Sequence, residues 1–207
     1  MEMILVWITV KNVGGVSKGI GGSIDMYKVV RWNESIDLTD FYAKAEQKGF
    51  LNNSNRHMLI DCFNNEREYY LNLLYENDTI IGCQVVHSFD DVAGPGAYRS
   101  GRTCTVGGSK RLLGRATITK MQNYVDQFLH PASFKLIESL GGTHYSTSNI
   151  LKVGSQEKVN RTYFKELERQ GIVTYVKDIE YRNTPQTLWR FNNERFWKLK
   201  SIYPSWS

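Results

Sequence analysis

The strongest restriction on the fold comes from two β-rich runs joined by a tight polar turn. Residues 69–75 (YYLNLLY) and 80–89 (IIGCQVVHSF) are rich in aromatic and β-branched side chains, and the turn 76–79 (ENDT) between them is polar. Such runs about a short turn predict an antiparallel β-hairpin. A lone hairpin is only marginally stable in water, so this one needs further strands or helices to pack against.

The residues after the hairpin alternate between predicted strands and helices. Residues 98–106 predict a third strand, and residues 112–129 place apolar side chains at helical spacing. The later elements are a short helix after Pro131 over 134–140, a strand over 143–149, a helix over 158–170 that ends at Gly171, and strands over 172–181 and 186–192. This order is that of an α+β fold with a mixed, mainly antiparallel sheet flanked by helices.

The N-terminal part predicts two strands and helices that precede this core. Residues 4–10 and 24–32 are strand-like, and residues 37–48 form an amphipathic helix that begins at a capping Asp37. We found no repeat or linker, so we expect one domain over residues 1–207. Its parts are an N-terminal hairpin with helices (1–64), a core (65–192) and a C-terminal tail (193–207).

A glycine-rich loop at residues 15–21 (GVSKGIG) follows the first predicted strand and copies the cofactor loop of short-chain dehydrogenases. Such a loop works by presenting a pyrophosphate to the N-terminus of a following helix. Residues 22–30 are strand-like instead, and the chain contains no Y-x-x-x-K motif. We therefore interpret this segment as a flexible hairpin loop or a lid.

A second glycine-rich loop, at residues 107–116 (GGSKRLLGRA), lies between a predicted strand and a predicted helix. Small residues at Gly114 and Ala116 let a phosphate approach the backbone, and a helix start presents unpaired N–H groups to it. Lys110, Arg111 and Arg115 add positive charge. This turn is either an anion-binding site or a solvated basic helix start, and we favour the anion site.

The same turn resembles the acetyl-CoA-binding turn of the GCN5-related N-acetyltransferase (GNAT) superfamily. Residues 111–116 (RLLGRA) fit its Q/R-x-x-G-x-G/A pattern. The resemblance covers roughly residues 65–192: residues 69–89 are similar to the second and third strands, and 163–172 (YFKELERQGI) to a helix that ends in glycine. It implies an acyl-CoA N-acyltransferase-like fold that transfers an acetyl group from acetyl-CoA to an amine acceptor, without a metal.

The resemblance also implies which residues bind the cosubstrate. Acetyl-CoA is expected at the end of the third strand of the core, at the basic turn and after the strand 143–149. The residues concerned are Thr105, Val106, Lys110, Arg111, Gly114, Arg115, Ala116 and Asn149. The backbone near Thr105 would pair with the pantetheine amides and polarise the thioester.

Two residues are the catalytic candidates that follow from the resemblance. Tyr163 would protonate the leaving thiolate, although the family's usual tyrosine position is Leu167 here. Asp90 would accept the proton of the amine, because the predicted strand 98–106 contains no acidic side chain. Further candidates for this base lie near predicted strand ends. They are Asp91, His87 and His144.

Two alternatives stay open at this point. Residues 181–200 interleave basic and aromatic side chains, the pattern that single-strand nucleic-acid binding uses, so a nucleic-acid-binding protein without catalytic activity is one. A buried aromatic face of a terminal strand and helix would give the same pattern. The other alternative is a GNAT fold without activity, because the chain offers no obvious base.

Composition fits a globular chain that prefers anionic partners. The 207 residues include 41% hydrophobic side chains and carry a net charge of +5. Cys62, Cys83 and Cys104 show no metal-ligand spacing, and residues 4–8 are too short an apolar run for a signal peptide or a membrane span. We expect a cytoplasmic protein that does not bind membranes.

Short strings (RTCTV, YRNTPQTLWRFN) resemble marine tailed-phage proteins, which would make the host cytoplasm its compartment. The acceptor and the oligomeric state are left open.

Overall fold

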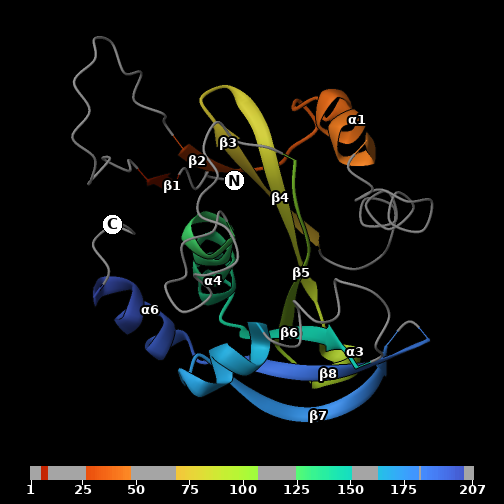
Figure 1. Cartoon of the computed structure of the whole chain (residues 1–207), viewed down its shortest axis with the longest axis vertical. Coiled ribbons are helices and arrows are strands. Elements are labelled where there is room, and N and C mark those ends of the chain that lie inside the picture. Colours follow the sequence, from red (N-terminus) through yellow and green to blue (C-terminus); the bar gives the residue numbers. More distant parts are fainter. Residues whose placement is uncertain are drawn as a thin grey trace.

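A computed structural model describes residues 6–8, 27–47, 69–106, 125–150, 163–181 and 183–202 (Figure 1). The strands are β1 (Val6–Ile8), β2 (Tyr27–Arg31), β3 (Tyr69–Glu76), β4 (Thr79–Ser88), β5 (Ala97–Thr105), β6 (Thr143–Asn149), β7 (Val173–Tyr181) and β8 (Thr184–Phe191). They form an 8-stranded sheet in the order β1-β2-β3-β4-β5-β6-β8-β7. β5 and β6 are parallel, and the other neighbours are antiparallel. The expected mixed, mainly antiparallel sheet is confirmed.

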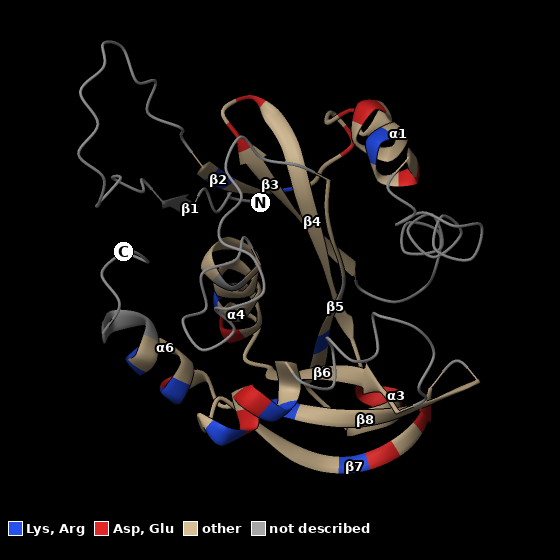
Figure 2. Ribbon diagram, viewed as in Figure 1, with Lys and Arg blue, Asp and Glu red and all other residues tan. Residues whose placement is uncertain are grey.

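Helices cover both faces of this sheet. They are α1 (Thr39–Gln47), α3 (Asp90–Ala93), the π-helix η2 (Val125–Leu129), α4 (His130–Ser139) and α6 (Asn193–Ile202), and residues 163–169 are also helical. α1 lies on one side of the β3–β4 hairpin and α4 on the other (Figure 1). Charged residues are frequent at the hairpin tip, on α1, on β7, on α6 and on the helical segment 163–169, and few lie on the strands in the middle of the sheet (Figure 2).

The predicted hairpin is β3 and β4, and its turn allows the chain to reverse within two residues. Asn77 adopts a positive φ of 54°, a conformation that asparagine tolerates better than most residues. The side chains of the hairpin alternate between the two faces. Leu71 and Leu73 face α1, whereas Asn72 faces α4.

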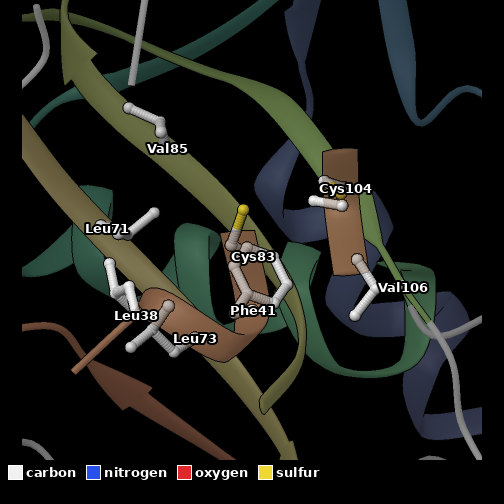
Figure 3. Close-up of a cluster of buried hydrophobic side chains, with 9 residues drawn as sticks. Leu38, Phe41, Leu71, Leu73, Cys83, Val85, Cys104 and Val106 are labelled. Atoms are coloured by element: carbon white, nitrogen blue, oxygen red, sulfur yellow. The ribbon is translucent and has the colours of Figure 1, made fainter. Parts of the chain in front are cut away.

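The α1 face holds one hydrophobic cluster, which Figure 3 shows. Its buried members are Leu38, Phe41, Ala45, Leu71, Leu73, Cys83, Val85, Cys104 and Val106. Asp37 caps α1 as predicted, because its Oδ1 accepts a hydrogen bond of 2.9 Å from the N–H of Thr39. Phe41 is 3% exposed, and burying a side chain of this size contributes about 2–3 kcal/mol.

The opposite face packs against η2 and α4, where the structure differs from our prediction. We expected the helix over 112–129 to end and a separate helix to begin at 134 after Pro131. Instead η2 runs directly into α4, and Pro131 is the second residue of α4. Phe128 and Leu129 are buried against β2 and β3.

The C-terminal strands and helices close the other half of the sheet. Gly171, at φ 73°, ends the helical segment 163–169 as predicted, and the N–H of Ile172 bonds to Leu167 O in a Schellman motif. Within the segment that we expected to be a tail, 193–202 form α6. Phe196 on α6 is fully buried and stacks on Phe134 with 4.0 Å between ring centroids.

Two expectations for the N-terminal part can be compared with the structure. Within the described residues, the strands expected over 4–10 and 24–32 are represented by β1 and β2. The glycine-rich loop 15–21 lies outside the described residues, and the next described residues after it form β2. That finding agrees with our rejection of a dinucleotide-binding loop. The division into one domain stays a prediction.

Candidate functional site

The site begins where the two parallel strands separate. β5 and β6 pair only through Ala97–Thr143, Tyr98–His144 and Arg99–Tyr145. Beyond these pairs β5 continues along β4, and β6 continues along β8. The sheet therefore opens at the carboxyl ends of two parallel strands, which is where open sheets with parallel strands bind ligands.

A cavity of about 480 Å³ occupies this opening. Its walls come from β4, β5, β6, β8, η2, α4 and the start of the helical segment 163–169. The described lining residues are Gln84, Arg99, Ser100, Gly101, Thr103, Thr105, Val125, His130, Ser146, Thr147, Asn149, Tyr163, Phe164 and Gln186. Most of them are polar, and none of them is a carboxylate.

A β-bulge in β5 arranges the wall of the cavity. Cys83 pairs with Cys104 and Val85 pairs with Gly101, so two residues of β5 lie opposite Gln84 alone. The extra residue changes which side chains face α4. As a result Thr103 reaches Gln84 on the α4 side, whereas Cys104 joins the cluster under α1.

A buried hydrogen-bond network lies under the α4 side of the cavity. Asn72 Nδ2 donates to Ser133 Oγ at 3.1 Å, and Ser133 Oγ donates to Gln84 Oε1 at 2.6 Å. Gln84 Nε2 then donates to Thr103 Oγ1 at 2.9 Å and contacts His130 Nδ1 at 3.4 Å. The network connects β3, β4, β5 and α4, and it fixes the orientation of the Gln84 amide.

His130 lines the cavity as a neutral imidazole. Burial lowers the pKa of His130 to about 4, so the ring carries one proton at neutral pH. Because Nδ1 accepts from the Gln84 amide, that proton lies on Nε2. The Tyr163 ring stacks on His130 with 6.5 Å between centroids. This contact holds the tyrosine at the cavity wall.

Arg99 of β5 also lines the cavity and connects β5 to β6. Its Nη2 and Nε donate to Thr147 Oγ1 on β6 at 2.8 Å and 3.2 Å, and its Nη1 lies 3.4 Å from His87 Nε2. The guanidinium also lies over the Tyr181 ring. A Cβ atom at Gly101 would lie 3.0 Å from Nη1, so the guanidinium would have to shift by a few tenths of an ångström to admit a side chain there.

The structure brings three of the predicted site residues together. Thr105, Asn149 and Tyr163 all line the cavity. Val106 does not, because its N–H bonds to Ile81 O and its side chain is buried under α1. The remaining cofactor-binding predictions lie outside the described residues. They are Lys110, Arg111, Gly114, Arg115 and Ala116.

The predicted bases lie away from the lining or are already engaged. Asp90 is exposed at the start of α3, and its Oδ1 accepts from the N–H of Ala97 at 3.0 Å, which is a structural role in the loop. Asp91 is also exposed on α3. His87 Nδ1 donates to Ser88 O. His144 is buried beside the cavity, hydrogen-bonded to Ser100.

Among the described residues of 181–200, the aromatic side chains of Trp189, Phe191 and Phe196 are buried and are not available for stacking bases. Trp189 and Phe191 are 2% and 6% exposed, and Phe196 is fully buried. Trp189 Nε1 donates to Ser148 Oγ at 2.8 Å, and Trp197 Nε1 donates to Glu138 Oε1. The alternation of basic and aromatic residues therefore reflects one face turned to the core and one to solvent.

Two features are absent from the part of the chain that the structure describes. No group of three or more His, Cys, Asp or Glu side chains there is arranged to hold a metal ion. No helix there has the length and apolar character needed to cross a bilayer.

Comparison with known proteins identifies the architecture. No protein-family model and no curated protein matches the sequence. Among solved structures, a GNAT-family protein from Desulfovibrio desulfuricans is 10% identical with a TM-score of 0.53, covering 80% of this chain and 99% of that one. The aminoglycoside 6′-N-acetyltransferase from Enterococcus faecium is 14% identical with a TM-score of 0.51, covering 80% and 96%. The chain has the GNAT fold.

A third solved structure has a similar fold. An uncharacterised protein from Bacillus halodurans is 10% identical with a TM-score of 0.54, covering 87% of this chain and 91% of that one. At such low identities the similarity establishes the fold, and the reaction has to be argued from the cavity. The proposed similarity to phage proteins stays a prediction.

Sequence analysis missed Ser100, Gln84 and His130, which are central to the geometry of the site. Gln84 is 1% exposed in the middle of an otherwise apolar strand, and a polar residue at such a position is the signal that could have found it. His130 precedes Pro131 and was hidden by the expected helix break. Ser100 carries no local signal, because serine is common in strands and loops alike.

Proposed function

We propose that this protein transfers an acyl group, acetyl in the first instance, from acyl-CoA to an amine. The observation that carries the proposal is the separation of β5 and β6 after Arg99 and Tyr145, which opens a polar cavity of about 480 Å³ between two parallel strands. The GNAT fold agrees with it. The aminoglycoside 6′-N-acetyltransferase that shares this fold is, by its name, an N-acetyltransferase.

The reaction needs an extended site for the thioester arm. Past residue 99, the edge of β5 that faces the opening forms no ladder pair with β6 among the described residues. An extended pantetheine chain would lie along this edge next to Thr105, as an added strand does. The basic turn after β5, with Arg111 and Gly114, would then receive the pyrophosphate.

The chemistry consists of one attack and two proton movements. The amine nitrogen attacks the thioester carbonyl carbon, the C–S bond breaks, the amine loses a proton and the departing thiolate gains one. Tyr163, at the wall of the cavity, is our candidate for protonating the thiolate. His130, with a pKa of about 4, is too weak a base to hold the amine's proton at neutral pH, and the described lining offers no carboxylate for that role. No described lining residue is thus a candidate for taking the amine's proton, and we propose that the amine enters uncharged or loses its proton to water.

Ligand-induced stabilisation tests this function directly. Acetyl-CoA at 100 times its Kd should stabilise the fold by about 2.7 kcal/mol, which raises the Tm by about 5–11 °C for a chain of this size. NAD, ATP and short oligonucleotides at the same concentrations should not. Release of free CoA thiol with a panel of amines then measures transfer.

Matched variants locate the binding site. Asn149→Trp should block the mouth of the cavity and abolish the acetyl-CoA shift, whereas Thr174→Trp, on the exposed face of β7, should keep it. Arg111→Glu and Gly114→Asp should also weaken the shift. An equal shift for wild type and these three site variants, or no shift with acetyl-CoA at all, would overturn the proposal.

A further inference from the structure

Ser100 is located at the floor of the cavity. It follows Arg99, the last residue of β5 that pairs with β6, and it lines the opening although it is only 1% exposed. Its backbone carbonyl accepts a hydrogen bond from Ser146 Oγ, which fixes the local backbone. The hydroxyl of Ser100 is therefore positioned where a ligand in the cavity would meet the sheet.

The one hydrogen bond of the Ser100 hydroxyl is made to His144 on β6. Ser100 Oγ lies 2.6 Å from His144 Nε2, and within the described residues it has no other partner. The His144 ring is held on two sides. It stacks on Phe191 with 4.3 Å between centroids and meets the edge of Phe134 at 4.6 Å.

The surroundings of His144 determine where its proton lies. The ring is 1% exposed and neutral, because desolvation, with a smaller effect from His130, lowers the pKa of His144 well below its usual value. Its Nδ1 is buried without a hydrogen-bond partner in the described part of the chain. In either tautomer Nδ1 has no partner, but folded proteins leave a buried N–H without an acceptor more rarely than a buried acceptor without a donor. A proton on Nε2 is donated to Ser100 Oγ, so this tautomer is favoured.

This tautomer determines what the Ser100 hydroxyl can do. When His144 Nε2–H donates to Ser100 Oγ, the hydrogen of that hydroxyl does not point back at His144. It turns about the Cβ–Oγ bond toward another acceptor, and the cavity is the open space that Ser100 faces. Ser100 thus presents a hydrogen-bond donor whose oxygen is held in place by a buried imidazole.

We propose that the Ser100 hydroxyl donates a hydrogen bond to the carbonyl oxygen of the bound thioester, with His144 as its positioning residue. The inference rests on the acyl transfer proposed above. As the amine attacks, the carbonyl π-electron pair moves to oxygen, and a donor placed beforehand stabilises that negative charge. Ser100 forms no covalent bond and gives up no proton in this role.

The same geometry argues against Ser100 as a nucleophile. Activation of a serine requires a base that can accept its proton, and Nε2 of His144 already carries one. No third group orients Nδ1 from the other side of the ring, as a catalytic triad requires. We therefore expect direct transfer to the amine without an acyl-enzyme.

Infrared difference spectroscopy of bound [1-¹³C]acetyl-CoA tests the hydrogen bond without knowledge of the acceptor. In the wild type the thioester carbonyl band should lie at a lower frequency than in Ser100→Ala, because the hydrogen bond weakens the C=O bond. Ser88→Ala, a serine of β4 outside the cavity lining, should give the wild-type band. His144→Phe keeps an aromatic ring but loses the Nε2–H, and its band should move toward that of Ser100→Ala.

Activity gives a second readout once an amine substrate is in hand. Ser100→Ala should lower kcat about 100-fold and change the Kd of acetyl-CoA by less than about 3-fold. Equal carbonyl bands in wild type and Ser100→Ala, or an acetyl group found on Ser100 by mass spectrometry, would overturn this role and leave the acyltransferase function standing. Failure of the wild type to bind acetyl-CoA would overturn both.

Discussion

Lowering the pH from 7 to 5 is expected to destabilise the fold through two buried histidines. Burial lowers the pKa of His130 to about 4 and that of His144 well below its usual value. In the unfolded chain both return to a pKa near 6.5. Below pH 6.5 the unfolded state therefore binds protons that the folded state does not. As a result, the free energy of unfolding decreases as the pH is lowered.

The size of this loss depends on the difference between the pKa of each histidine in the unfolded state and in the folded state. A histidine that titrates only in the unfolded state costs about 1.4 kcal/mol for each pH unit below its unfolded pKa. For His130 the loss ends near pH 4, where the folded state also takes up the proton, so the full loss is about 3 kcal/mol. Between pH 7 and pH 5 the two histidines together remove about 4 kcal/mol. The pKa of Glu166 is lowered to about 2, so its titration falls below this window.

Urea denaturation followed by tryptophan fluorescence at pH 7, 6 and 5 measures the effect. The His144→Phe variant removes one of the two titrating groups, so its loss between pH 7 and pH 5 should be about half that of the wild type. Its absolute stability can differ without affecting this comparison. A wild-type free energy of unfolding that changes by less than about 1 kcal/mol between pH 7 and pH 5, or a variant with the full wild-type slope, would refute the reasoning.

Two further predictions concern stability at neutral pH. Ser133→Ala should lower the free energy of unfolding by about 2–4 kcal/mol, because Asn72 and Gln84 both lose a buried partner. Ser139→Ala at the exposed end of α4 is its control, and equal urea midpoints for the two variants would contradict the prediction. Gly171→Ala should cost about 1–2 kcal/mol, because φ is 73° there and the nearest side-chain atom is 3.8 Å from an added Cβ. A urea midpoint equal to that of the wild type would show that the backbone conformation carries no such cost.

The elements with strong local signals could be predicted from the sequence. The β3–β4 hairpin follows from two β-rich runs about a polar turn, and the end of the helical segment 163–169 follows from Gly171. β6 was predicted with the bounds that the structure shows, Thr143–Asn149. In each case the deciding interactions lie within a few residues of one another in the chain, so local pattern and local physics agree.

The site could be predicted only in part, because its geometry depends on contacts between distant residues. Tyr163, which the family resemblance indicates, lines the cavity, but Gln84 reaches Ser133 and His130 across 49 and 46 residues of chain. A one-residue bulge in β5 decides which side chains enter the cavity, and nothing in the residues around Thr103 announces it. Pro131 led us to expect a break in the helix, but the structure shows a helix that continues through it. Proline is compatible with the first turn of a helix as well as with its interruption.

β6 connects the stability of the sheet with its proposed chemistry. It lies inside the sheet between β5 and β8, yet its sequence, THYSTSN, contains no aliphatic residue. Its buried side chains are His144, Ser146 and Ser148, and each has a hydrogen-bond partner on a neighbouring strand. An interior strand usually buries Val, Ile or Leu, which would contribute about 1.5–3 kcal/mol each by leaving water. The chain forgoes that stabilisation along the strand that forms one wall of the opening. A polar strand in this position suits a site that must hold polar groups in fixed directions, and β6 supplies Ser146, Thr147 and Asn149 to the lining of the cavity.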